Sequence, residues 1–140
     1  MASRLTPYLN FDGQTAEAMT FYRDVLGGEL TITRFGDFGE TGPGVDPDGT
    51  MHAQLETPAG FSLMASDMPP GQPIERGNNF SVSLFGDDEA ELRGYFDGLA
   101  EGGTVAMPLE KQMWGDVFGM VVDKFGTAWM VNISEPGRQG

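Results

Sequence analysis

An internal repeat is the feature of this sequence that most constrains its fold. A shift of 75 residues aligns five identities: Leu9 with Leu84, Asp12 with Asp87, Phe21 with Phe96, Gly27 with Gly102 and Gly28 with Gly103. Each identity falls at the same place in a local pattern, which runs from an alternating apolar segment through an acidic turn, an amphipathic helix and a Gly-Gly stop to another apolar segment. Such a repeat predicts two copies of one structural module.

The pattern predicts one helix in each copy. The apolar faces are formed by Met19, Tyr22, Val25 and Leu26 within residues 15–26, and by Leu92, Tyr95, Phe96 and Leu99 in the second copy. Asp88 with Glu91 three residues later resembles a capping box at the start of the second helix. The glycine pair after each helix accepts positive φ angles, as a helix stop requires.

Extended segments surround each helix. Residues 5–11 precede the first helix, and residues 80–85 precede the second. Three further strands are predicted after each helix, at 29–35, 51–56 and 61–65 in the first copy and at 104–107, 117–122 and 128–133 in the second. The sequence therefore predicts an α+β fold of two tandem βαβββ modules, whose curved mixed sheets enclose a cleft. A cleft between modules is a common place for a ligand.

Loops and connectors divide the chain further. A second shift, of 66 residues, aligns Gly60 with Gly126 and Met64 with Met130, so the first copy has extra residues at 36–50. Five Gly and two Pro in that segment predict a surface loop, either a plain one or a lid over the cleft. We expect a single domain over residues 1–140, with modules at 4–67 and 79–134 and a Pro- and Gly-rich connector at 68–78.

The composition excludes some partners. Eight Lys and Arg against 21 Asp and Glu give a net charge of −13, which repels phosphate backbones and anionic membrane surfaces. No apolar run approaches the length of a membrane span, and the first residues lack an apolar signal segment. We therefore expect a cytoplasmic protein without nucleic-acid or membrane partners. Because the chain has no cysteine, a disulfide, a thiolate zinc site and a cysteine nucleophile are excluded.

Several short motifs carry a resemblance to a known family. They are FYRDVLGGEL at 21–30, MHAQL at 51–55, LMASD at 63–67, MPLE at 107–110 and DKFGTAW at 123–129. Together they resemble the PhnB-like branch of the vicinal oxygen chelate superfamily, which includes glyoxalase I, extradiol dioxygenases and the bleomycin and fosfomycin resistance proteins. The resemblance covers nearly the whole chain. It implies the glyoxalase/bleomycin resistance fold, a small-molecule ligand and a homodimer.

The resemblance also implies where a divalent metal would bind. Enzymes of the superfamily hold the metal on four strand positions, typically His and Glu, and these positions fall here on Thr6, Met64, Ser81 and Met130. Hydroxyls and thioethers are poor ligands for a hard cation. We therefore predict no metal or other cofactor at these positions, with Met64 and Met130 filling the module centres. The alternative is a relocated metal held by His52 and carboxylates such as Glu56 or Glu110.

Two polar side chains are the candidates for catalysis. His52 is the only histidine, so no other side chain has an ordinary pKa near neutrality. The period of a strand places His52, Gln54 and Glu56 on one face, either in the cleft or in solvent. On the first strand, Tyr8 and Asn10 share a face, and both can donate a hydrogen bond to a substrate oxygen. The alternative for Tyr8 is a ring packed in the core with its hydroxyl at the edge.

The segment from 112 to 131 divides into two parts. Trp114 and Phe118 each precede a glycine, an arrangement that suits a pocket rim or a dimer interface. The rest of the segment and the end of the last strand are predicted to supply ordinary core residues: Val121, Val122, Trp129, Val131 and Ile133. Our candidates for substrate binding are thus Asn10, Gln54, Met64, Trp114, Phe118 and Met130.

Two functions remain open from the sequence. The first is a binding protein without catalysis, whose acidic, aromatic cleft favours a cationic or aromatic small molecule. The second is a glyoxalase-type lyase, isomerase or dioxygenase that acts on a small oxygenated substrate, with metal if the relocated site exists.

Overall fold

The computed structural model describes residues 3–135. The chain forms two compact units, Met1–Glu75 and Arg76–Gly140, which we call the first and second units. The boundary falls inside the segment predicted to be the connector. The only helices in the described part have 12 residues each, apart from one short 3-10 turn, and none is long and apolar enough to cross a membrane.

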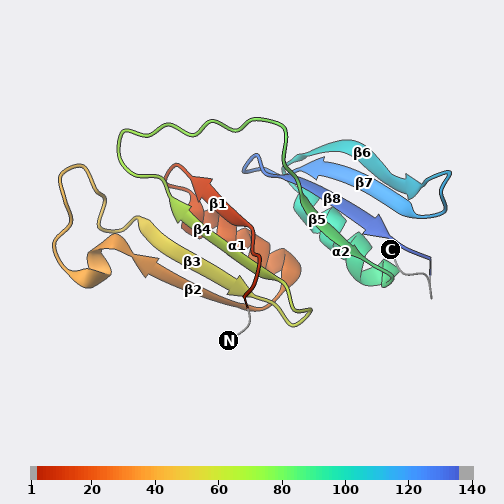
Figure 1. Cartoon of the computed structure of the whole chain (residues 1–140), viewed down its shortest axis with the longest axis horizontal. Helices are drawn as coiled ribbons and strands as arrows, with labels where there is room; N and C mark the ends of the chain where they lie inside the picture. The colour runs from red at the N-terminus through yellow and green to blue at the C-terminus, as the bar shows by residue number, and fades with distance from the viewer. Residues whose placement is uncertain (1–2, 136–140) are drawn as a thin grey trace. The chain divides into compact units, whose positions relative to one another are not determined.

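Each unit is a four-stranded mixed sheet with one helix (Figure 1). The first unit contains β1 (Tyr8–Phe11), α1 (Thr15–Leu26), β2 (Glu29–Arg34), the 3-10 turn η1 (Phe35–Phe38), β3 (Thr50–Glu56) and β4 (Ser62–Asp67). The second contains β5 (Val82–Gly86), α2 (Glu89–Ala100), β6 (Thr104–Lys111), β7 (Val117–Val122) and β8 (Ala128–Ile133). The strand orders β1-β4-β3-β2 and β5-β8-β7-β6 are equivalent. The predicted fold class of two tandem βαβββ modules is confirmed.

The glycine pairs explain why both copies keep the same geometry. Gly27 and Gly102, which follow the helices, have φ angles of 80° and 75°. At the next position, a Cβ on Gly28 would clash with the carbonyl oxygen of Glu56, and a Cβ on Gly103 would clash with that of Val122. These two carbonyls end β3 and β7, so the same close backbone contact occurs in both units. The shift of 75 residues found in the sequence therefore relates Gly28 to Gly103, and the shift of 66 relates Glu56 to Val122.

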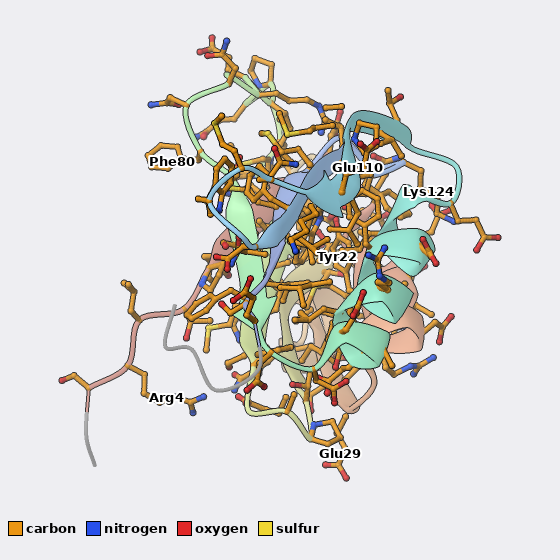
Figure 2. The ribbon with its side chains drawn as sticks, turned by 90° about the vertical axis from the view of Figure 1, so that its right-hand side faces the viewer. Arg4, Tyr22, Glu29, Phe80, Glu110 and Lys124 are labelled. Atoms are coloured by element: carbon orange, nitrogen blue, oxygen red, sulfur yellow. The ribbon has the colours of Figure 1, made fainter. Side chains whose placement is uncertain are left out.

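The helix of each unit covers one face of its sheet. In the first unit, the buried residues are Ala18, Met19, Tyr22 and Leu26 on α1 and Ala53, Leu55, Leu63 and Ala65 on the sheet. Tyr22, labelled in Figure 2, is fully buried. In the second unit, Leu92, Phe96 and Leu99 on α2 are buried, as are Val121, Trp129, Val131 and Ile133 on the sheet. The predicted core residues of the helices and strands are buried except Val25, Tyr95 and Val122, which are half-buried. Met64 and Met130, which were predicted to fill the module centres, are also only half-buried.

Polar side chains fix the ends of these elements. Asp88 accepts a hydrogen bond from the Glu91 amide and caps α2, which confirms this half of the predicted capping box. Tyr95 donates to Glu91 over 2.6 Å, and its partial burial, with this carboxylate, raises the pKa of Tyr95 to about 12. In the β7–β8 turn, the buried Asp123 accepts from the amides of Phe125 and Thr127 and from the indole nitrogen of Trp129.

Several strand boundaries differ from the predictions, most of all the start of β1 and the end of β6. β1 and β5 begin at Tyr8 and Val82, later than residues 5 and 80. Pro7 has no amide hydrogen, so it cannot extend the ladder of β1 as a donor. β6 runs to Lys111 instead of ending at 107, and it passes through Pro108. A proline is tolerated there because β6 is an edge strand that pairs only with β7 and has register shifts on both sides of Met107.

We predict that Gly28→Ala destabilises the protein by about 2–3 kcal/mol, because a side chain at positive φ meets the backbone of Glu56. The matched control is Gly94→Ala in α2, where a Cβ meets nothing within 4 Å. Alanine there should stabilise the helix by about 0.5–1 kcal/mol. Urea unfolding of the two variants measures both effects, and equal stabilities would contradict the role given to Gly28.

Candidate functional site

The sheet of the first unit has a second face, on the side opposite to the buried residues of β3 and β4. Side chains alternate along each strand, so the neighbours of Ala53, Leu55 and Ala65 point to this other side. Strand pairing aligns Tyr8 with Met64, Met64 with Gln54, and Gln54 with Thr31. We call this surface the polar face and define it by Tyr8, Asn10, Thr31, His52, Gln54, Glu56 and Met64. Five of the predicted site residues are thus brought together.

Tyr8 and His52 form a hydrogen-bonded pair on the polar face. The Tyr8 hydroxyl lies 3.3 Å from Nδ1 of His52, and the two ring centroids are 5.9 Å apart. The hydroxyl donates to Nδ1 when the ring proton is on Nε2, and Nε2 then serves as a donor to a ligand. Tyr8 is 47% exposed, so the alternative of a ring packed in the core is wrong. The arrangement can bind a ligand oxygen or exchange a proton with it.

Gln54 is oriented by a neighbouring carboxylate. Its Nε2 donates to Glu56 Oε1 over 2.6 Å, and the Ser62 hydroxyl donates to the same oxygen over 2.8 Å. Arg4 lies 3.6 Å from the other carboxylate oxygen. The hydrogen bond from Gln54, followed by that from Ser62 and the charge of Arg4, lowers the pKa of Glu56. Because the nitrogen of Gln54 is committed to Glu56, its carbonyl oxygen is the end of the amide that can accept from a ligand.

The remaining predicted site residues lie on the second unit. Its sheet also has a face opposite to its buried residues, where Phe118 pairs with Asn132, and Met130 pairs with Met120. Trp114, 53% exposed, follows β6 and lies with its ring centroid 6.2 Å from that of Phe118. We call this surface the apolar face and define it by Phe85, Met107, Trp114, Phe118, Met120 and Met130. Trp114, Phe118 and Met130 therefore come together, as a second group.

The positions implied for a metal can be located relative to the strands. Thr6 and Ser81 lie outside β1 and β5, and the residues that pair with Met64 and Met130 are Tyr8 and Ser83, two positions further along. Sequence alone could not give this register, since it depends on pairing between distant strands. Hydroxyls and thioethers still do not fit a hard divalent cation.

The relocated metal site lacks a ligand cluster. Within residues 3–135, no three His, Asp or Glu side chains are grouped so that they could hold a metal ion. The carboxylate of Glu56 is engaged by Gln54 and Ser62. His52 is instead directed to Tyr8.

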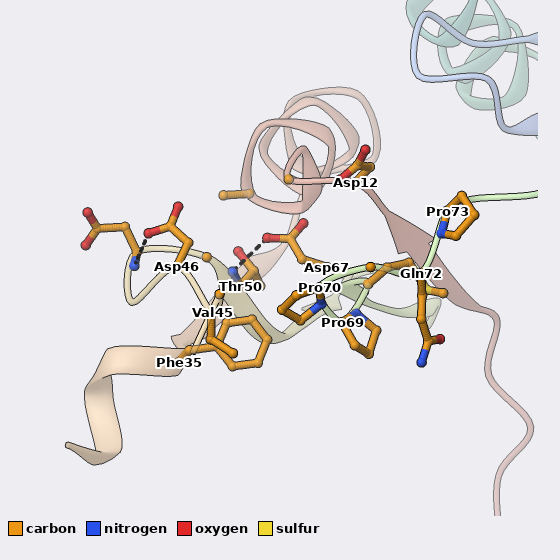
Figure 3. Close-up of a pocket in the computed structure, with 17 residues that line it drawn as sticks. Asp12, Phe35, Val45, Asp46, Thr50, Asp67, Pro69, Pro70, Gln72 and Pro73 are labelled. Atoms are coloured by element: carbon orange, nitrogen blue, oxygen red, sulfur yellow. Dashed lines mark hydrogen bonds between the residues drawn. The ribbon is translucent and has the colours of Figure 1, made fainter. Parts of the chain in front are cut away.

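A cavity of about 570 Å³ lies elsewhere in the first unit (Figure 3). Its wall combines the end of β1, the start of α1, the loop after β2, the end of β4 and residues 68–73. The lining includes no Lys, Arg or His. Four carboxylates line the cavity: Asp12, Asp46, Asp48 and Asp67. None of the predicted site residues contributes. The Gly- and Pro-rich composition of 36–50 and 68–78 was the only sequence signal for this cavity.

Asp67 holds the cavity wall together. Its carboxylate accepts from the amide and hydroxyl of Thr15 at the start of α1, over 3.1 and 2.7 Å. The other oxygen accepts from the amide of Thr50, where the loop returns to β3, over 2.8 Å (Figure 3). Asp67 therefore has a structural role, and the loop 36–50 forms a wall of the cavity.

The comparison with known proteins gives the family. The family model described as "Glyoxalase/Bleomycin resistance protein/Dioxygenase superfamily" matches residues 4–131 of this chain. The chain belongs to this superfamily. Protein YjdN of Escherichia coli K12 is 36% identical over 141 residues, which cover 92% of this chain and 94% of that protein.

Two solved structures are similar to this superfamily member in both fold and sequence. Protein PA1353 from Pseudomonas aeruginosa has a TM-score of 0.84 and 43% identity, over 96% of this chain and 99% of that one. The PhnB protein from Bacillus cereus has a TM-score of 0.74 and 26% identity, over 94% of this chain and 100% of that one. The resemblance to the PhnB-like branch is thereby confirmed.

We predict that Gln54→Ala raises the pKa of Glu56 towards its ordinary value, because Gln54 supplies the main hydrogen bond to the carboxylate. A lowered pKa stabilises the folded state above the ordinary pKa, and this contribution is lost as the pH falls through the lower folded value. Carbon-13 NMR titration of the Glu56 carboxyl measures the change. Gln112→Ala, in the second unit, is the control, and an unchanged Glu56 pKa in Gln54→Ala would contradict the assignment.

Proposed function

We propose that this superfamily member binds a small molecule on the polar face, with Tyr8 and His52 at the centre of the site. The observation that carries the proposal is the Tyr8–His52 hydrogen bond on an exposed sheet face that also presents Gln54. These groups offer a donor and an acceptor to one ligand, while Met64 beside them provides adaptable apolar contact.

The charge of the chain suggests the class of ligand. A net charge of −13 favours the approach of cations, and aromatic rings bind cations and other rings through their faces. Trp114, Phe118 and Met130 on the apolar face are candidates for a separate set of ligand contacts within the second unit. The ligand class is therefore a cationic or aromatic small molecule. The exposed aromatic rings of the apolar face also support a homodimer.

A second candidate is a glyoxalase-type lyase, isomerase or dioxygenase acting on a small oxygenated substrate. The Tyr8–His52 pair favours it, because in the tautomer whose Nδ1 proton is donated to the Tyr8 hydroxyl oxygen, Nε2 of His52 can accept a proton from a substrate carbon or oxygen and return it. The donors at the superfamily's metal positions do not fit a divalent ion, so we derive no step through a metal.

A panel of aromatic amines, such as tryptamine and benzylamine, tests the proposal. We expect at least one compound to raise the melting temperature, because a ligand that binds only the folded state stabilises it. His52→Ala and Tyr8→Phe should each weaken its binding at least roughly tenfold in calorimetric titration, whereas Asp46→Asn in the cavity should not.

If Asp46→Asn weakened binding while His52→Ala and Tyr8→Phe did not, the ligand would lie in the cavity and the proposal would be contradicted. Mass spectrometry of the same incubations separates the two candidate functions. Unchanged compound supports binding alone, and a product that His52→Ala abolishes supports the enzyme.

A further inference from the structure

Three methionines form a row across the apolar face of the second unit. Met107 on β6 pairs with Met120 on β7, and Met120 pairs with Met130 on β8. Ser83 on β5 completes the row beyond Met130. The proposed function uses only Met130 of these residues, and the fold needs none of the three in its buried core.

The pairing brings three thioethers within reach of one point. Directly paired residues of antiparallel strands share a face, with Cβ atoms about 4.5–5.5 Å apart. Met120 is the middle residue, so Met107 and Met130 flank it on both sides. A methionine side chain has three rotatable bonds, and the outer two can lean their sulfur atoms towards the centre.

The row is also accessible from solvent. Met107 is 40% exposed, and Met120 and Met130 are half-buried. The helix of the same unit does not cover them, because α2 packs on the other face through Leu92, Phe96 and Leu99.

Thioether sulfur is a soft donor that selects copper(I) over the hard divalent ions. The chain has no cysteine, so no thiolate competes for such an ion. The only histidine belongs to the first unit, outside the row. The net charge of −13 favours the approach of a cation.

We propose that Met107, Met120 and Met130 form a binding site for a soft monovalent metal ion of the copper(I) class. The site differs from the divalent site of the superfamily in its ligands and its ion. It lies within one sheet and uses sulfur donors only. Two of its residues, Met107 and Met120, are not among the metal positions of the superfamily. It goes beyond the proposed small-molecule function and does not depend on it.

Silver(I) is the probe, because it has the preference of copper(I) for sulfur and no redox chemistry under these conditions. Titration of the 140-residue chain with silver nitrate in chloride-free buffer is followed by NMR of the methionine methyl groups. We expect saturation at one equivalent, with the largest shifts at Met107, Met120 and Met130. The Met120→Leu variant should bind silver at least roughly tenfold more weakly, since it removes the central ligand and keeps the side-chain volume.

Met51→Leu is the matched control. Met51 lies on β3 of the first unit and is 37% exposed, close to the exposure of Met107, and its loss should leave silver binding unchanged. Met107→Leu on the edge strand gives a second test that does not rely on the folding of Met120→Leu. Equal weakening by Met51→Leu, or full silver binding by both Met107→Leu and Met120→Leu, would overturn the site.

Discussion

One helix can cover only one face of a four-stranded sheet, and the rest of this structure depends on that constraint. α1 and α2 each bury an apolar face, and side chains alternate along the strands, so every second residue lies on the other face. Ala53 and Leu55 are therefore core residues, while His52 and Gln54, which alternate with them along β3, are available for chemistry. The candidate site follows from the strand period and the position of the helix.

The two units keep the same backbone and differ in what they present. Gly28 and Gly103 make the same close backbone contact, which holds each helix to the end of its sheet. On the face without a helix, the first unit carries the Tyr8–His52 pair and Gln54, whereas the second carries methionines and aromatic rings. The same fold thus presents a hydrogen-bonding surface in the first unit and an apolar surface in the second. Function depends on the residues of these two faces more than on the fold.

Local patterns predicted much of the fold. Both helices, the bounds of β7 and β8 and the buried strand residues follow from periodicity and glycine positions, because these are properties of neighbouring residues. The passage of β6 through Pro108 depends on its place at the edge of the sheet, and the pairing of Tyr8 with Met64 depends on contact between strands that are far apart in the sequence. The grouping of His52, Gln54 and Glu56 was predictable from their spacing, but the hydrogen bond to Tyr8 and the cavity beside Asp67 were not.

We propose the polar face of the first unit, and not the acidic cavity of the same unit, as the place where a ligand binds. Nitrogen-15 NMR shift mapping with a stabilising aromatic amine tests it most directly, since it compares the two surfaces in one titration. We expect the largest shifts on Tyr8, His52 and Gln54. Shifts concentrated on Asp12, Asp46 and Gln72, which line the cavity, would contradict it.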